Sequence, residues 1–97
     1  MKFDLTKPIK IAGEEIVSIE LAEERLTTRL IKQLGFPFNF GPDLMPVPRS
    51  NVCAEYISRL AAISPSEVER LSPQDFMAMS FALVGFFVER GASTPQG

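Results

Sequence analysis

Residues Phe76–Val88 read FMAMSFALVGFFV, and this stretch decides which folds are open to the chain. It holds no charged residue, and eleven of its thirteen residues are apolar. As a helix it would be about 20 Å long, whereas the hydrocarbon core of a bilayer is about 30 Å thick. We therefore expect a helix that is buried in protein and does not span a membrane.

The flanking residues supply start and stop signals for this helix. Ser72 and Pro73 stand at the N-cap and first helical positions, with Asp75 two residues further on. Gly91 is suited to end the helix. We predict a helix over residues 73–90 and a flexible tail over residues 92–97.

The apolar character of this helix runs almost all the way round it, and a chain of 97 residues has little else with which to cover every side. We expect one face to form the core and another to contact a second chain, since large exposed apolar patches mark such contacts. The alternative is a central helix wrapped by the rest of the chain. The candidate partner-binding residues are Met77, Phe81, Val84 and Val88, with Ala78, Ala82 and Gly85 allowing close approach.

Upstream, the apolar spacing changes from two to three or four residues. Alternation on both sides of Ala12-Gly13 predicts a β-hairpin over residues 3–21. Helical spacing and capping residues then predict helices over residues 23–34, 51–63 and 65–71. The expected fold is α+β, a single domain over residues 1–97 in which the N-terminal hairpin packs on a bundle of three to four helices.

The segment from Phe36 to Pro48 contains four prolines and three phenylalanines, and we predict a loop there. Its rings either tuck over the core as a lid or act as aromatic anchors of a mobile binding loop. Burial of the rings is the favoured interpretation, because aromatic side chains gain most from leaving water.

Composition excludes several classes of function. The chain has no histidine and one cysteine, Cys53, which rules out imidazole chemistry, an internal disulfide and a cysteine-rich metal site. No catalytic residue, cofactor or metal site is expected, and no signal peptide is expected from Met1-Lys2-Phe3-Asp4. A net charge of −2 makes nucleic acid an unfavourable partner.

The order of these features resembles a known family. The residues that carry the resemblance are Pro8, Ile9, Gly13, Glu14, Ile16, Ile19 and Leu21, followed by Leu71, Ser72, Pro73, Asp75 and Phe76. They resemble the small, protein-E-like tail assembly chaperones of contractile-tailed phages and prophages. The resemblance extends over residues 3–88, although the Phe- and Pro-rich segment has no counterpart in it.

This resemblance implies a non-enzymatic protein of the bacterial cytoplasm that keeps the apolar, helical tape-measure protein soluble during tail assembly. It also implies a longer form made by ribosomal frameshifting, whose extension recruits the tail-tube protein; this chain would be the short form. The rival interpretations are a small homo-oligomeric structural or adaptor protein that uses its C-terminal helix for self-association, a transcription regulator or antitoxin that uses Arg25, Arg29 and Lys32, and an enzyme that uses Glu55 or Tyr56.

If the candidate face binds the client, Phe81→Asp or Val84→Asp should abolish client solubilisation and leave the helix content of the protein intact. Circular dichroism separates this outcome from simple unfolding, which would identify the substituted residue as part of the core.

Overall fold

Two antiparallel strands, β1 (Lys2–Ile11) and β2 (Glu14–Glu20), form the N-terminal hairpin. The computed structural model describes residues 1–92, with side chains up to residue 89. The hairpin turn has Ala12 at φ 54° and Gly13 at φ 83°. Positive φ at both central residues is the type I′ geometry, which matches the twist of the flanking strands.

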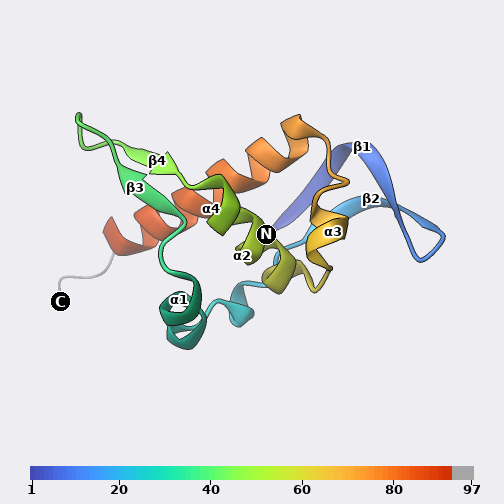
Figure 1. Ribbon diagram of the computed structural model, residues 1–97, viewed down its shortest axis with the longest axis horizontal. Coiled ribbons are helices and arrows are strands. Elements are labelled where there is room, and N and C mark those ends of the chain that lie inside the picture. Colours follow the sequence, from blue (N-terminus) through green and yellow to red (C-terminus); the bar gives the residue numbers. More distant parts are fainter. Residues whose placement is uncertain (93–97) are drawn as a thin grey trace.

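Four α-helices follow among the described residues: α1 (Thr28–Leu34), α2 (Ser50–Ala61), α3 (Pro65–Val68) and α4 (Pro73–Ala92). A short 3₁₀ turn, η1 (Glu23–Arg25), precedes α1. Figure 1 shows the β1–β2 hairpin at one end of an elongated molecule, with α4 running lengthwise beside α2. The predicted α+β class, a hairpin with three to four helices, is therefore confirmed.

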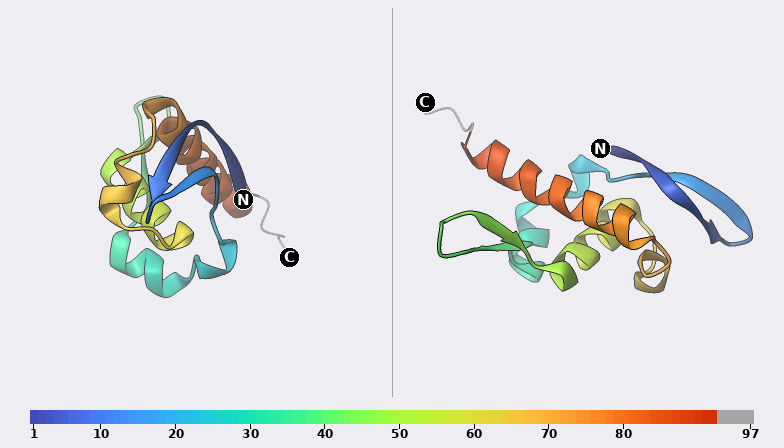
Figure 2. Two further views of the ribbon diagram at one scale, coloured as in Figure 1. Left: turned by 90° about the vertical axis from the view of Figure 1, so that its right-hand side faces the viewer. Right: turned by 90° about the horizontal axis from the view of Figure 1, so that it is seen from above.

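The core lies where α2, α4 and the hairpin meet. Its most enclosed side chains are Tyr56, Ile57 and Leu60 of α2, Met79 and Leu83 of α4, and Leu21 just after β2. Helix α4 contacts α2, β1 and β4, and the view from above in Figure 2 shows that no other element crosses its upper side. This arrangement leaves part of an apolar helix without a cover from its own chain.

The expected helix over residues 23–34 is divided into two elements. Thr27 adopts an extended conformation, with φ −114° and ψ 162°, and its hydroxyl accepts a hydrogen bond from the Leu30 amide at 3.2 Å. Threonine is a favoured N-cap residue because its side chain satisfies an amide that the helix cannot. The helix therefore begins at Thr28, and Leu26 lies in the break before it.

The bounds of three other predicted helices also differ. The helix expected over residues 51–63 is α2 and ends at Ala61. The helix expected over residues 65–71 ends at Val68, although its start matches the prediction: Ser64 and Glu67 form a reciprocal capping box. Helix α4 continues through Gly91 to Ala92, two residues past the expected end. The rest of the predicted flexible tail, residues 93–97, lies outside the described residues.

The predicted loop over residues 36–48 contains a second hairpin, which sequence analysis missed. Strands β3 (Phe38–Phe40) and β4 (Pro46–Pro48) pair antiparallel, with Phe38 opposite Pro48 and Phe40 opposite Pro46. Figure 1 places this hairpin at the opposite end of the molecule from β1–β2. Phenylalanines at alternate positions are typical of a strand, and they were the signal for this hairpin. The four prolines of the segment argue against a strand, and for that reason a loop was predicted.

A wide irregularity interrupts the β1–β2 ladder between Asp4 and Ile9 of β1. Residues 5–8 of β1 lie opposite Val17 alone in β2. The amides of Thr6 and Lys7 therefore have no partner in β2 and point toward α4. The Asp75 carboxylate accepts hydrogen bonds from the Thr6 amide at 3.0 Å, the Thr6 hydroxyl at 3.0 Å and the Lys7 amide at 3.2 Å. A side chain in the first turn of α4 thus satisfies backbone donors of β1 that the sheet leaves unpaired.

The same residue takes part in the cap of α4 through its backbone, because the Asp75 amide donates to the Ser72 hydroxyl at 3.1 Å. Burial of the Asp75 carboxyl opposes its ionisation, but the hydrogen bonds from Thr6, Lys7 and Ser72 outweigh burial and lower its pKa below the usual value. The ionised form is therefore the one that the fold stabilises.

We expect Asp75→Asn to lower the free energy of unfolding by about 1.5–3 kcal/mol, because the amide cannot accept all the bonds that the carboxylate accepts. Urea unfolding followed by circular dichroism would measure the loss. Asp4→Asn, on the exposed side of β1, is the matched control and should change stability little. Equal effects of the two substitutions would contradict the role given to Asp75.

The lowered pKa of Asp75 also predicts a pH dependence with a definite sign. Its contribution to stability should be complete above the unfolded-state value of about 3.8 and should vanish as the pH falls through the lower, folded-state pKa. The stability difference between the wild type and Asp75→Asn should accordingly shrink in strong acid. A difference that stays constant from neutral pH to pH about 2 would refute this assignment.

Candidate functional site

Exposed large apolar side chains gather on the β3–β4 segment and on one face of α4. Among the described residues, eight such side chains are at least half exposed, and seven of them belong to the segment 36–47 or to α4. They are Phe36, Phe40, Leu44, Met45, Val47, Met77 and Phe81. The eighth, Val17, lies on the β1–β2 hairpin, away from the others. This clustering is what an interaction surface requires.

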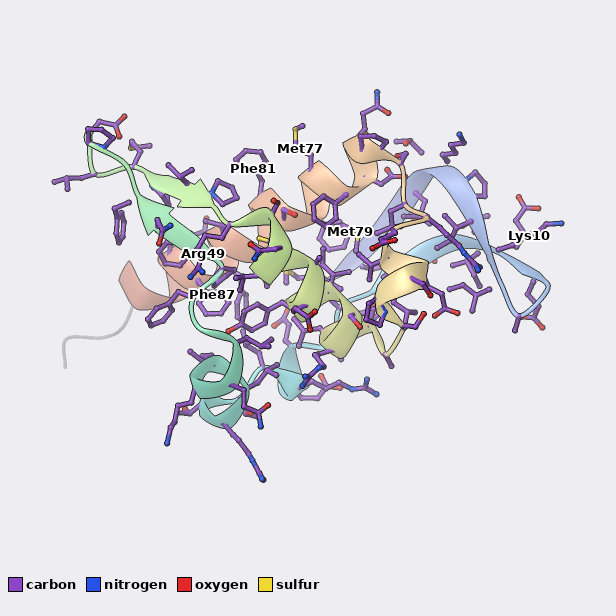
Figure 3. The ribbon with its side chains drawn as sticks, viewed as in Figure 1. Lys10, Arg49, Met77, Met79, Phe81 and Phe87 are labelled. Carbon is purple, nitrogen blue, oxygen red and sulfur yellow. The ribbon has the colours of Figure 1, made fainter. Side chains whose placement is uncertain are left out.

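On α4, Met77 and Phe81 are each 55% exposed and stand four residues apart, so they share one face of the helix. Figure 3 shows both side chains pointing away from the body of the protein, whereas Met79 and Phe87 point toward α2 and its neighbours. Ala78, beside Met77, is also exposed. Three of the seven residues predicted from the sequence therefore lie on an outward face.

The other four predicted residues are less accessible. Val84 is only 4% exposed and belongs to the core, while Val88, Ala82 and Gly85 are half-buried. The expectation that Val84 faces outward together with Phe81 is therefore not met, because the turn of the helix carries Val84 inward beside Leu83. A Cβ added at Gly85 would meet nothing within 4 Å, so no other part of the described chain uses its small size.

A groove of about 440 Å³ runs beside the outward face of α4. Its walls come from the end of β4, the start of α2 and the first half of α4: Pro48, Ser50, Pro73, Phe76, Met77, Ser80 and Phe81. A second hollow of about 360 Å³, between α2, α3 and α4, shares Pro73 and Phe76 with it. The two hollows therefore adjoin at Phe76, and each falls within the size range of concave binding sites.

The β3–β4 hairpin is held to α4 by aromatic contacts. The Phe38 ring lies 6.2 Å from the Phe87 ring, and Phe36 lies 6.3 Å from Phe87 in an edge-to-face arrangement. On its other side, Phe87 packs against Tyr56 at 5.6 Å. Of the three loop rings, Phe38 alone packs partly buried against the core, where it covers Phe87. Phe36 and Phe40 are 56% and 62% exposed, so the favoured expectation that these rings are buried is wrong for both.

The titratable groups near this surface have structural roles. Cys53 is fully buried, and burial raises the pKa of its thiol, as is typical of an unreactive cysteine. Tyr56 is also fully buried; its hydroxyl donates to the Gly35 carbonyl at 2.6 Å, and burial raises its pKa. Glu55 points to solvent, so these neighbours do not form a common site. Within residues 1–92, no set of three or more acidic or cysteine side chains could hold a metal ion.

Comparison with known proteins gives one family match. The sequence model of the family described as "Phage tail assembly chaperone proteins, E, or 41 or 14" matches residues 2–88. No curated protein and no solved structure gives a significant match. Separately, none of the helices in the described part of the chain has the length and apolar content needed to cross a membrane.

The positions of Phe81 and Val84 predict opposite effects of the same substitution. Val84→Asp places an unpaired carboxylate in the core and should destabilise the protein by about 3–5 kcal/mol, enough to unfold a small domain. Phe81→Asp should cost less than about 1 kcal/mol, because that side chain is already half in water. Thermal melts of the two variants would compare them directly, and equal losses would mean that Phe81 also belongs to the core.

Proposed function

The chain belongs to the family of phage tail assembly chaperone proteins, and from this membership we propose that it binds the tape-measure protein and keeps it soluble while the tail is assembled. The mode of action is binding and not catalysis. The place of action is the cytoplasm of the bacterial host. Contact with the tail-tube protein, through a longer frameshifted form, belongs to the same proposal.

The observation that carries this proposal is the surface formed by Met77, Phe81 and the exposed residues of segment 36–47. A holdase for an apolar helical client needs apolar surface of its own that stays open in the free protein. No charged side chain lies between Phe76 and Val88, so the α4 part of the surface holds no charge that would have to be buried when a client binds.

The side chains on this surface suit a client of varied sequence. Met77 and Met45 are unbranched, flexible and polarisable, and methionines of this kind adapt to differently shaped partners. Phe81 and Phe40 add large apolar area with few rotatable bonds. The surface therefore combines adaptable contacts with rigid ones.

Self-association through the same face of α4 is the competing function. It would use Met77, Ala78 and Phe81 as a contact between copies of this chain. The two functions differ in what happens when client is present: a chaperone raises the soluble amount of the client, whereas a self-assembling protein does not.

Co-expression with the tape-measure protein of the same phage or prophage tests the proposal. We expect the wild type to raise the soluble fraction of that protein, Phe81→Asp to abolish the gain, and Val17→Asp to retain it. Val17 is 57% exposed, so it is matched to Phe81 in exposure but lies on the distant hairpin. No gain with the wild type, or equal loss with both variants, would refute the proposal. An overlapping reading frame behind a slippery heptamer near the 3′ end of the gene would support the longer form.

A further inference from the structure

The tip of the β3–β4 hairpin is a defined turn. The Leu44 amide donates to the Gly41 carbonyl at 2.9 Å, and the Gly41 amide donates to the Met45 carbonyl at 2.9 Å. Pro42 and Asp43 occupy the centre of the turn, and the Asp43 carboxylate accepts from the Met45 amide at 3.1 Å. The one charged side chain of the segment 36–48 is thus used to build the turn.

Leu44 is the unusual residue of this turn. Its φ is 63°, in the left-handed region, at the position after a turn where hairpins of this kind normally place glycine. It is also 78% exposed, more than any other large apolar side chain among the described residues. Asparagine or glycine would adopt this conformation with less strain and would not expose a butyl side chain to water. Folding of the isolated chain therefore gives no reason for leucine here, and an outlier of this kind points to a contact outside it.

We propose that the β3–β4 hairpin is a client-binding arm, and that an apolar α-helix of the client lies between this arm and the outward face of α4, with Leu44 as the contact at the tip. The proposal rests on the proposed function and deepens it, because it names the mode of binding. It also assigns a role to the segment for which the sequence left a lid and a binding loop open. Phe38 anchors the arm to Phe87, and the large apolar side chains beyond it, Phe40, Leu44, Met45 and Val47, are at least half exposed.

The β4 edge of the arm, which borders the groove at Pro48, favours a helix over an extended segment as the occupant. At the two ends of the β3–β4 ladder, the Arg49 amide donates to the Pro37 carbonyl and the Gly41 amide donates to the Met45 carbonyl. Hydrogen-bonded positions alternate along an antiparallel pair, so Pro46 and Pro48 fall at the positions where an amide would point away from β3. Proline has no amide hydrogen, and the outer edge of β4 therefore lacks donors for an added strand. A helix needs no such donors, because its backbone hydrogen bonds are internal.

The groove offers what a helix would use. Met77 and Phe81 form a ridge with the small Ala78 beside them, which allows close packing of a second helix. The groove of about 440 Å³ lies between this ridge and Pro48 at the base of the arm. An apolar helix seated there would contact α4 on one side and the arm on the other.

The test uses the full chain and a synthetic amphipathic peptide of about 20 residues, long enough to form a helix, with equal numbers of lysine and glutamate and one central tryptophan. The protein contains no tryptophan, so tryptophan emission reports the peptide alone. A second peptide, with two central residues changed to proline, has the same charge but cannot form the helix. The variants are Leu44→Asn, which suits the left-handed conformation, Phe81→Ser on α4, and Val17→Thr as the exposed apolar control on the distant hairpin.

We expect the helical peptide to bind the wild type and Val17→Thr equally, and to bind Leu44→Asn and Phe81→Ser roughly tenfold more weakly, the loss expected for one buried apolar side chain. The thermal midpoint of Leu44→Asn should equal or exceed that of the wild type. The proline-containing peptide should not bind.

Other results would overturn the proposal in distinguishable ways. Unchanged binding by Leu44→Asn, with weakened binding by Phe81→Ser, would remove the arm from the site and leave the proposed function standing. Equal binding of the proline-containing peptide would exclude a helix as the occupant. A dimer seen by light scattering for the wild type and absent for Leu44→Asn would make a second copy the occupant. Failure of the wild type to bind the peptide would overturn the arm proposal alone if co-expression succeeds, and both proposals if co-expression also fails.

Discussion

The carboxylate of Asp75 joins the N-terminal hairpin to the first turn of α4. It receives the Thr6 and Lys7 amides that the interrupted β1–β2 ladder leaves unpaired, and it stands in the first turn of α4, beside the Ser72 cap. These bonds fix the hairpin against the start of the helix. With the hairpin on one side and α2 on another, Met79, Leu83 and Val84 are covered, and the side that carries Met77 and Phe81 is left open. The exposed surface is therefore the side of α4 that neither α2 nor the hairpin held by Asp75 covers.

A helix that is apolar on nearly every side is normally enclosed, and this one is enclosed only in part. The rest of the chain covers one side of α4. Near the C-terminal end of the helix, Phe36 and Phe38 pack against Phe87. The rest of the apolar surface stays in contact with water, at a cost of about 25 cal/mol per Å². A small monomer of marginal stability gains nothing from such exposure. The family to which the chain belongs supplies a reason, because a chaperone must offer apolar surface before its client arrives.

Local chemistry made much of the fold predictable, and long-range geometry accounts for what was missed. The alternation around Ala12-Gly13 and the Ser-Pro starts at Ser64 and Ser72 report structure within a few residues, and the structure agrees with each. The break at Thr27 was also local, but its capping signal was hidden within a continuous helical pattern. The second hairpin escaped detection because its strands have three residues each and carry prolines. The inward turn of Val84 could not be foreseen, since it depends on how α2 packs against α4. Asp75 was identified as a cap, but its bonds to Thr6 span 69 positions of sequence.

The elongated shape of the molecule, 47 Å by 28 Å by 22 Å, separates two kinds of surface. The apolar arm lies at one end and the β1–β2 hairpin at the other (Figure 1), and the outward positions of that hairpin carry Lys2, Asp4, Lys7, Lys10, Glu14, Glu15 and Glu20. The molecule is therefore amphipathic along its long axis, with a largely apolar end and a largely charged end. A partner bound at the apolar end would leave the acidic and basic side chains of the other end in water. Under the proposed function, the solubility of the complex would then come from the end of the protein that does not touch the partner.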